Sequence, residues 1–119
     1  MEFKHEVSEN NVLIITMSGD LIGENNGPEL FTLVNDKIKG GYYYCAVDLS
    51  NVRYMNSSGI GILITLLTKF RNHEGEMVLI KPSETIRKLL IITKLNKIFT
   101  INETRDDAVK SLTPNQKSN

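Results

Sequence analysis

The chain has 119 residues, a length that fits one domain and excludes a multi-domain enzyme. Its 14 basic and 14 acidic side chains leave no formal net charge, which argues against a nucleic-acid-binding protein and against a polybasic membrane anchor. No apolar run approaches the roughly 20 residues of a membrane span, and the polar N-terminal residues do not resemble a signal peptide. The single cysteine, Cys45, excludes an internal disulfide and is expected in the core, so we predict a cytoplasmic protein without a membrane partner.

The N-terminal segments predict a β-hairpin followed by a loop. Residues 12–17 are apolar and largely β-branched, which is typical of a strand buried on both faces. Residues 3–7 alternate weakly between apolar and polar, and Asn10 and Asn11 mark a turn between the two segments. Glycine and asparagine cluster in residues 19–27, which indicates a loop.

The next helix and strand are bounded by residues that start and stop helices. Pro28 suits the first helical position, and the glycine pair at 40–41 ends the helix. Residues 42–49 predict a strand, and the polar residues 50–55 predict a connection after it.

A second helix is predicted to begin at Ser57 or Ser58 and to end near Gly75. Its apolar residues cover an arc of about 200° around the helix, which is wider than one sheet face needs. Ile62 and Leu66 lie at the margin of this arc. This wide arc has two interpretations: the helix is buried more deeply, or it offers an apolar edge to a partner.

The remaining elements continue the alternation of strands and helices, with Ser83 and Asn102 as N-caps of the last two helices. The isoleucines that follow Leu90 are expected on the apolar face of the third helix. We expect a strand at 77–80, a helix over 82–95, a strand at 98–101 and a helix through 112.

The resulting order, ββαβαβαβα, predicts an α/β protein. We expect a small mixed β-sheet, mostly parallel with an N-terminal antiparallel hairpin, and about four helices. The first strand should lie at or near an edge of the sheet. One domain is expected over residues 1–112, followed by a polar C-terminal tail at 113–119.

Residues 48–62 run from a strand into a helix N-terminus, where unsatisfied N–H groups favour an anion such as phosphate. This stretch does not complete a dinucleotide fingerprint or a Walker A loop, and Ser57 lacks the flanking glycines of a nucleophile elbow. His5 and His73 are expected far from the serines, and one cysteine with two scattered histidines gives no metal-ligand spacing. We therefore expect no catalytic residue, no cofactor and no metal. Helix capping alone explains Ser57 and Ser58 without any further function.

The run Asp48-Leu49-Ser50, followed by Asn56-Ser57-Ser58-Gly59-Ile60-Gly61, resembles the signature of STAS domains, specifically of bacterial anti-sigma-factor antagonists. In that family, Asp-Leu-Ser/Glu leads to Asp-Ser-Ser-Gly-Leu/Ile-Gly. The runs at 17–21 and 75–79 also match, and the resemblance extends over residues 3–112. It implies a STAS-type fold.

The resemblance also implies a function for the serine pair. The unphosphorylated form of such proteins binds an anti-sigma factor that is also a serine kinase, and this binding releases a sigma factor. The kinase then phosphorylates the first serine, here Ser57 with Ser58 as the alternative, and a metal-dependent serine phosphatase restores it. The alternative function is a constitutive STAS interaction module, in a signalling or transport assembly, that phosphorylation does not regulate.

Two positions depart from the family pattern, because Asn56 replaces the usual aspartate and Ile22 stands where a carboxylate is common. Glu24 is the nearest substitute for that carboxylate. We expect a monomer or weak dimer whose partner surface comprises Ile22, Gly23, Glu24, Asn25, Asn56, Ser57, Ser58, Gly59, Ile60, Gly61 and Ile62.

Overall fold

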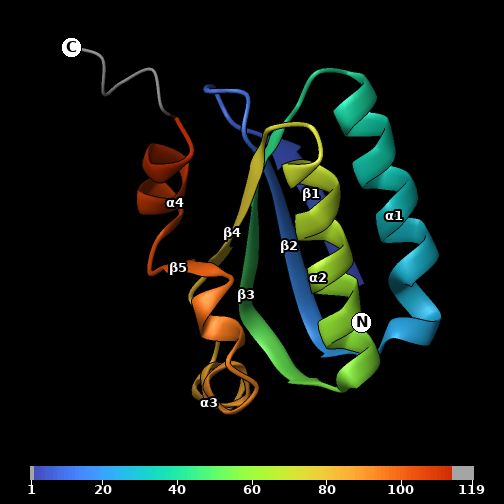
Figure 1. The fold of residues 1–119 in the computed structure, drawn as a ribbon, viewed down its shortest axis with the longest axis vertical. Coiled ribbons are helices and arrows are strands. Elements are labelled where there is room, and N and C mark those ends of the chain that lie inside the picture. The colour runs from blue at the N-terminus through green and yellow to red at the C-terminus, as the bar shows by residue number, and fades with distance from the viewer. Residues whose placement is uncertain (1, 114–119) are drawn as a thin grey trace.

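The computed structural model describes residues 2–113, apart from the side chains of residues 23–26. Its elements follow the predicted order of strands and helices (Figure 1). They are β1 (Glu2–Val7), β2 (Leu13–Leu21), α1 (Gly23–Lys39), β3 (Tyr44–Met55), α2 (Ser57–Arg71), β4 (Glu76–Ile80), α3 (Glu84–Ile92), the 3-10 helix η1 (Leu95–Lys97), β5 (Thr100–Asn102) and α4 (Arg105–Ser111).

The strands form one sheet in the order β1-β2-β3-β4-β5. Strands β1 and β2 pair antiparallel, and every other neighbouring pair is parallel. The predicted hairpin and the edge position of the first strand are therefore confirmed. Asn11 adopts a positive φ of 64° in the hairpin turn, a conformation that asparagine tolerates better than most residues.

Successive residues of the central strands are buried on opposite faces of the sheet, as predicted for residues 12–17. On one face, Leu13 and Ile15 pack in the main core beneath α1, α2 and α3. On the other face, Ile14 packs in a smaller cluster that α4 covers through Ala108 and Leu112. On this main face α1 packs against α2, whereas α3 packs on β3 and leaves a gap toward the start of α2.

Strand β3 continues to Met55, so the connection predicted at residues 50–55 is wrong. The polar residues of this segment lie on exposed faces of the strand, whereas Val52 and Met55 are buried. The strand stays paired with β2 because β2 is also longer than predicted, and Leu21 lies opposite Met55. Two register shifts between the strands accommodate this extension, and at each shift β3 has one more residue than β2.

Helix α1 begins at Gly23, five residues before the predicted start at Pro28. The loop predicted over residues 19–27 therefore contains the end of β2 and the first turn of α1. Gly27 packs on α2, because a Cβ atom there would lie 3.5 Å from Cδ1 of Ile62. Residues at the start of α1 are poor helix formers, and this contact holds that part of the helix against the core. The predicted stop is confirmed, with Gly41 at a φ of +96°.

The last predicted elements differ mainly in their ends. Ser83 caps α3 as predicted, and its hydroxyl accepts from the Ile86 N–H at 3.3 Å. Helix α3 ends at Ile92, earlier than predicted, and η1 follows. The cap of α4 is Thr104 rather than Asn102, because the Thr104 hydroxyl accepts from the Asp107 N–H.

Candidate functional site

The site is built where β2 and β3 end side by side and α2 begins. The N-cap of α2 is Asn56, whose side-chain oxygen accepts from the Gly59 N–H at 2.8 Å. The Asn56 N–H in turn donates to the Leu21 carbonyl at 3.4 Å, which ties the helix start to the end of β2. The alternative that Ser57 or Ser58 caps this helix is therefore wrong.

Ser57 and Ser58 are the first two residues of α2, and both are exposed. The first hydrogen bond within the helix runs from the Ile60 N–H to the Asn56 carbonyl at 2.9 Å. Among the side chains that the structure describes, none forms a hydrogen bond with either serine hydroxyl. Both hydroxyls are thus accessible at the positive end of the helix dipole.

Activating bases lie elsewhere in the fold. His5 is on the edge strand β1, and His73 follows the far end of α2, where its ring stacks on Tyr43 and its Nδ1 lies 3.0 Å from the Lys69 carbonyl. Burial raises the pKa of the Cys45 thiol, which lies in the main core. Each of these groups is where the sequence predicted it.

The two glycines of the motif have different roles. Gly59 is buried, and a Cβ atom there would approach the Leu21 carbonyl oxygen to 2.2 Å. Only glycine lets α2 start this close to the end of β2. A Cβ atom at Gly61 would meet nothing within 4 Å. The fold therefore needs the first glycine but gives no steric reason for the second.

The other residues predicted at the partner surface fall into three groups. Ile22 is half-buried at the N-cap of α1, next to the segment of Gly23, Glu24 and Asn25, whose side chains lie outside the described part of the structure. Ile60 is half-buried near the serines. Ile62 is only 4% exposed and packs in the main core, so the wide apolar arc of α2 reflects deeper burial.

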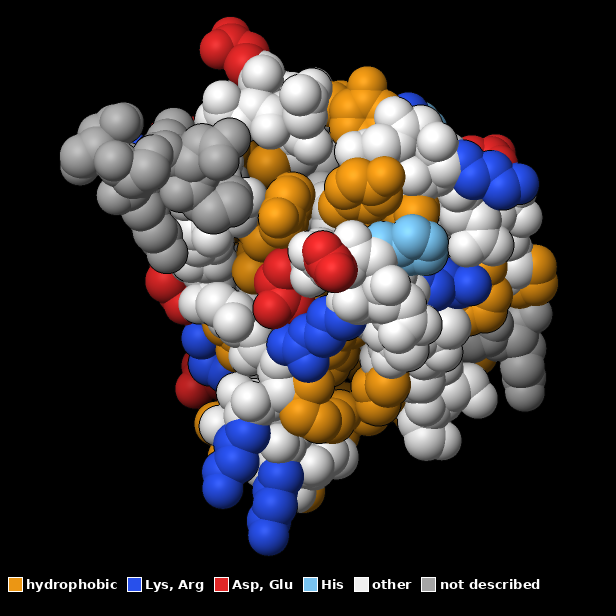
Figure 2. Space-filling view, turned by 45° about the horizontal axis from the view of Figure 1, so that its top comes forward, with side chains coloured by type: hydrophobic (Ala, Val, Ile, Leu, Met, Phe, Trp, Pro, Cys, Tyr) orange, Lys and Arg blue, Asp and Glu red, His pale blue; other side chains and the backbone are white. Residues whose placement is uncertain are grey.

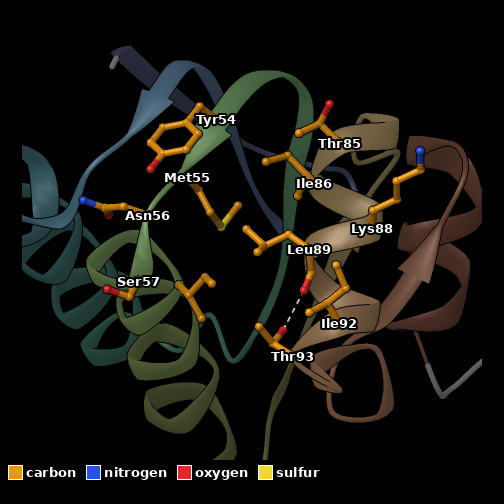
Figure 3. Close-up of a pocket in the computed structure, with 11 residues that line it drawn as sticks. Tyr54, Met55, Asn56, Ser57, Thr85, Ile86, Lys88, Leu89, Ile92 and Thr93 are labelled. Carbon is orange, nitrogen blue, oxygen red and sulfur yellow. Dashed lines mark hydrogen bonds between the residues drawn. The ribbon is translucent and has the colours of Figure 1, made fainter.

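An open apolar groove of about 660 Å³ lies beside Ser57, between the start of α2 and α3 (Figure 3). Met55 and Leu89 point toward one another from its two walls. Its lining residues are Tyr54, Met55, Asn56, Ser57, Ile60, Thr85, Ile86, Lys88, Leu89, Ile92 and Thr93. The prediction that the isoleucines after Leu90 lie on the apolar face of the helix is wrong, because Ile92 is 77% exposed and Ile91 is 55% exposed.

Charges near the groove are unevenly distributed. Among the described residues that line the groove, Lys88 carries a charge and the others are uncharged. Arg53 and Asp20 form an exposed ion pair of 3.3 Å at the ends of β3 and β2, outside the groove lining. Toward the opposite end of the molecule, by contrast, basic, acidic and apolar side chains are interspersed on the surface (Figure 2).

The first part of the predicted motif has a structural role away from the serines. The Asp48 carboxylate accepts from the N–H and hydroxyl of Ser50 at 2.9 and 2.7 Å. It also lies 3.6 Å from Nε of Arg105, whose guanidinium donates to Glu6 and Thr16 as well. These contacts hold the start of α4 against the sheet.

Comparisons with known proteins agree with this architecture. The chain is 30% identical over 76 residues to the anti-sigma-B factor antagonist of Staphylococcus aureus, covering 64% of this chain and 70% of that one. An anti-sigma factor antagonist from Mycobacterium paratuberculosis superposes with a TM-score of 0.78 at 23% identity, covering 93% and 92% of the two chains. The phosphorylated form of the Bacillus cell fate determinant SpoIIAA superposes with a TM-score of 0.72 at 20% identity, covering 92% and 98%.

Within residues 2–113, no helix is long and apolar enough to cross a membrane. The sequence model of the STAS domain matches residues 4–108, which is most of the chain. The chain therefore belongs to the STAS domain family, as one of its anti-sigma factor antagonist members.

Proposed function

We propose that this protein is an anti-sigma factor antagonist that is switched by phosphorylation of Ser57. The unphosphorylated form binds an anti-sigma factor that is also a serine kinase, and this binding releases a sigma factor. The observation that carries the proposal is the exposed Ser57 hydroxyl, which has no capping role because Asn56 caps the helix. Ser58 is also exposed and is the alternative acceptor.

Phosphorylation at Ser57 is compatible with the fold. A phosphate adds about −1.5 to −2 charges and three acceptor oxygens. At the first residue of α2 the helix dipole favours this charge, so the modification acts at the surface and leaves the helix folded. Binding of a partner that covers Ser57 is then opposed by bulk and by the desolvation of the phosphate. A thousandfold loss of affinity requires only about 4 kcal/mol.

The enzymes of this cycle are the partners. The anti-sigma factor supplies the nucleotide and the phosphoryl group, and a metal-dependent serine phosphatase removes the phosphate. The antagonist itself acts by binding. Its contact surface comprises the start of α2 from Asn56 to Gly61, together with the segment from Ile22 to Asn25 at the start of α1, since both helices begin at the same end of the sheet (Figure 1).

Asn56 favours a second candidate function, in which the chain is an interaction module that phosphorylation does not regulate. Its amide keeps the cap but lacks the negative charge of the usual aspartate, so a kinase that recognises this charge would not act on the chain. The constitutive module predicts binding that ignores the state of Ser57.

The two functions are separated by measuring binding and phosphorylation with the same proteins. Each anti-sigma factor kinase encoded in the source genome is purified, and its affinity for the chain is measured by calorimetry, before and after incubation with ATP. We expect one kinase to bind, to add one phosphate at Ser57, and to bind Ser57→Asp at least a hundredfold more weakly than Ser57→Ala. Matched substitutions at Ser58 are the control. Equal affinity for wild type, Ser57→Ala and Ser57→Asp, without phosphate transfer, would refute the switch.

A further inference from the structure

The groove between α2 and α3 carries large apolar side chains that are exposed. Four apolar residues that line the groove are accessible to different degrees. Tyr54 is 53% exposed and Ile92 is 77% exposed, whereas Ile60 and Leu89 are half-buried. Its volume of about 660 Å³ lies in the range of pockets that hold several apolar groups. A concave, mostly apolar site with a few polar groups at its edge is the kind of surface that binds a ligand or a partner segment.

The two walls of the groove differ in charge. The α2 wall is neutral, because the sequence has no charged residue between Arg53 and Lys69. The segment 84–98, which contains the α3 wall, has four basic residues and a single acidic one, Glu84. Arg87 is paired with Glu103 at 3.2 Å, but among the described side chains Lys88 forms no ion pair. Among the residues whose side chains are described, no acidic one lines the groove.

We propose that this groove receives an apolar segment of the anti-sigma factor that carries an acidic side chain beside its anchoring apolar residues. The inference rests on the proposed function and names a second contact region of the same interface. The apolar anchor covers Ile92, Leu89 and Tyr54. The acidic side chain pairs with Lys88, where none of the described lining residues is acidic and would repel it.

The position of Ser57 connects the groove to the switch. Ser57 lines the groove on the α2 wall, opposite the α3 residues (Figure 3). A phosphate on Ser57 therefore adds negative charge at the edge of the apolar surface that the partner must cover. It makes desolvation of this end of the groove costly when the segment docks. This cost opposes docking of the segment.

The proposal is tested by the affinity of purified variants for the purified anti-sigma factor kinase, with neighbouring exposed residues as controls. Ile92→Ser removes an apolar groove residue, and Ile91→Ser makes the same change at an exposed residue that does not line the groove. Lys88→Glu reverses the groove charge, and Lys97→Glu makes the same change in η1. All four side chains are exposed, so the thermal midpoints should remain near that of wild type.

We expect Ile92→Ser to weaken binding about tenfold, which corresponds to about 1.4 kcal/mol, and Ile91→Ser to change it less than twofold. Lys88→Glu should weaken binding by more than Lys97→Glu does. The attraction at Lys88 is screened by salt, so this difference should shrink at high ionic strength.

Other outcomes would overturn the inference. If Ser57→Asp blocks binding but Ile92→Ser and Lys88→Glu do not, the groove is not part of the interface, while the proposed function stands. If Ile92→Ser abolishes self-association without changing the affinity for the kinase, a second copy of the chain occupies the groove. Tighter binding by Lys88→Glu would mean a basic partner segment. If no anti-sigma factor kinase binds wild type, the inference falls together with the proposed function.

Discussion

Gly59 and Gly61 lie two residues apart in the first turns of α2, yet the structure predicts opposite effects for the same substitution at the two positions. A Cβ atom at Gly59 would lie 2.2 Å from the Leu21 carbonyl oxygen and 3.0 Å from its carbon. Both are backbone atoms, so relief requires movement of the helix or the strand. A Cβ atom at Gly61 would meet nothing within 4 Å.

The magnitudes follow from these distances. In both variants, replacing glycine by alanine inside a helix contributes about 1 kcal/mol of stability. We expect Gly61→Ala to gain the full amount of about 1 kcal/mol of stability, because the new Cβ atom meets nothing within 4 Å. Gly59→Ala also forces an overpacked contact, which costs about 1–3 kcal/mol. The shift further weakens the Asn56 N–H bond to Leu21, which contributes about 1 kcal/mol. The net loss for Gly59→Ala is about 2 kcal/mol.

Urea denaturation and thermal unfolding, followed by circular dichroism, measure both effects. For a domain of this size, 1 kcal/mol shifts the thermal midpoint by about 4 °C. We therefore expect Gly61→Ala to raise the midpoint by about 4 °C and Gly59→Ala to lower it by about 8 °C. Equal midpoints for the two variants would refute the assignment of Gly59 to the contact with β2. Weaker partner binding by the stabilised Gly61→Ala would assign Gly61 to the interface, since the fold does not need it.

The remaining predictions concern the helix cap and the buried thiol. Asn56→Ala should lower the free energy of unfolding in urea by about 1 kcal/mol, whereas Asn56→Asp should preserve it within a few tenths, because the cap needs only an acceptor oxygen. An equal loss in both variants would contradict the cap. Burial raises the pKa of the Cys45 thiol above its ordinary value of about 9. The unfolded chain then releases a proton above pH 9 that the folded protein retains. This thiol therefore destabilises the folded state by about 1.4 kcal/mol per pH unit above pH 9 and has no such effect below it. The measurement is the difference in unfolding free energy between wild type and Cys45→Ala from pH 8 to 10.5, and a constant difference would refute this linkage.

The order of elements could be predicted because each buried strand is short and apolar, and each helix has a start or stop signal in its sequence. The end of β3 could not, because residues 50–55 are mostly polar. They remain in a strand because Val52 and Met55 reach the core while the other side chains face solvent, and register shifts against β2 allow this spacing of three. Pairing of β2 with β3 stabilises this extension, and composition does not reveal that pairing.

The serine pair could be located from its motif, but the groove beside it could not. Its second wall comes from α3, which begins 27 residues after Ser57 in the sequence. The local signal was the pair Ile91-Ile92, which adds apolar residues beyond those that one helix face can bury. From the sequence alone this excess indicates core residues, whereas both side chains are exposed. Only the packing of α3 on β3 and η1, which leaves Ile91 and Ile92 in solvent, distinguishes the two interpretations.

Asn56 separates two roles that an aspartate at this position would combine. The cap role requires an oxygen that accepts the Gly59 N–H, and the amide provides it at 2.8 Å. A carboxylate would add a negative charge beside Ser57, which repels an incoming phosphate but offers a kinase a charge to recognise. Asn56→Asp thus changes the charge while the geometry of the cap stays the same. A faster phosphorylation of this variant would show that the kinase reads the carboxylate. A slower one would show that repulsion dominates, and that asparagine makes Ser57 the easier residue to modify.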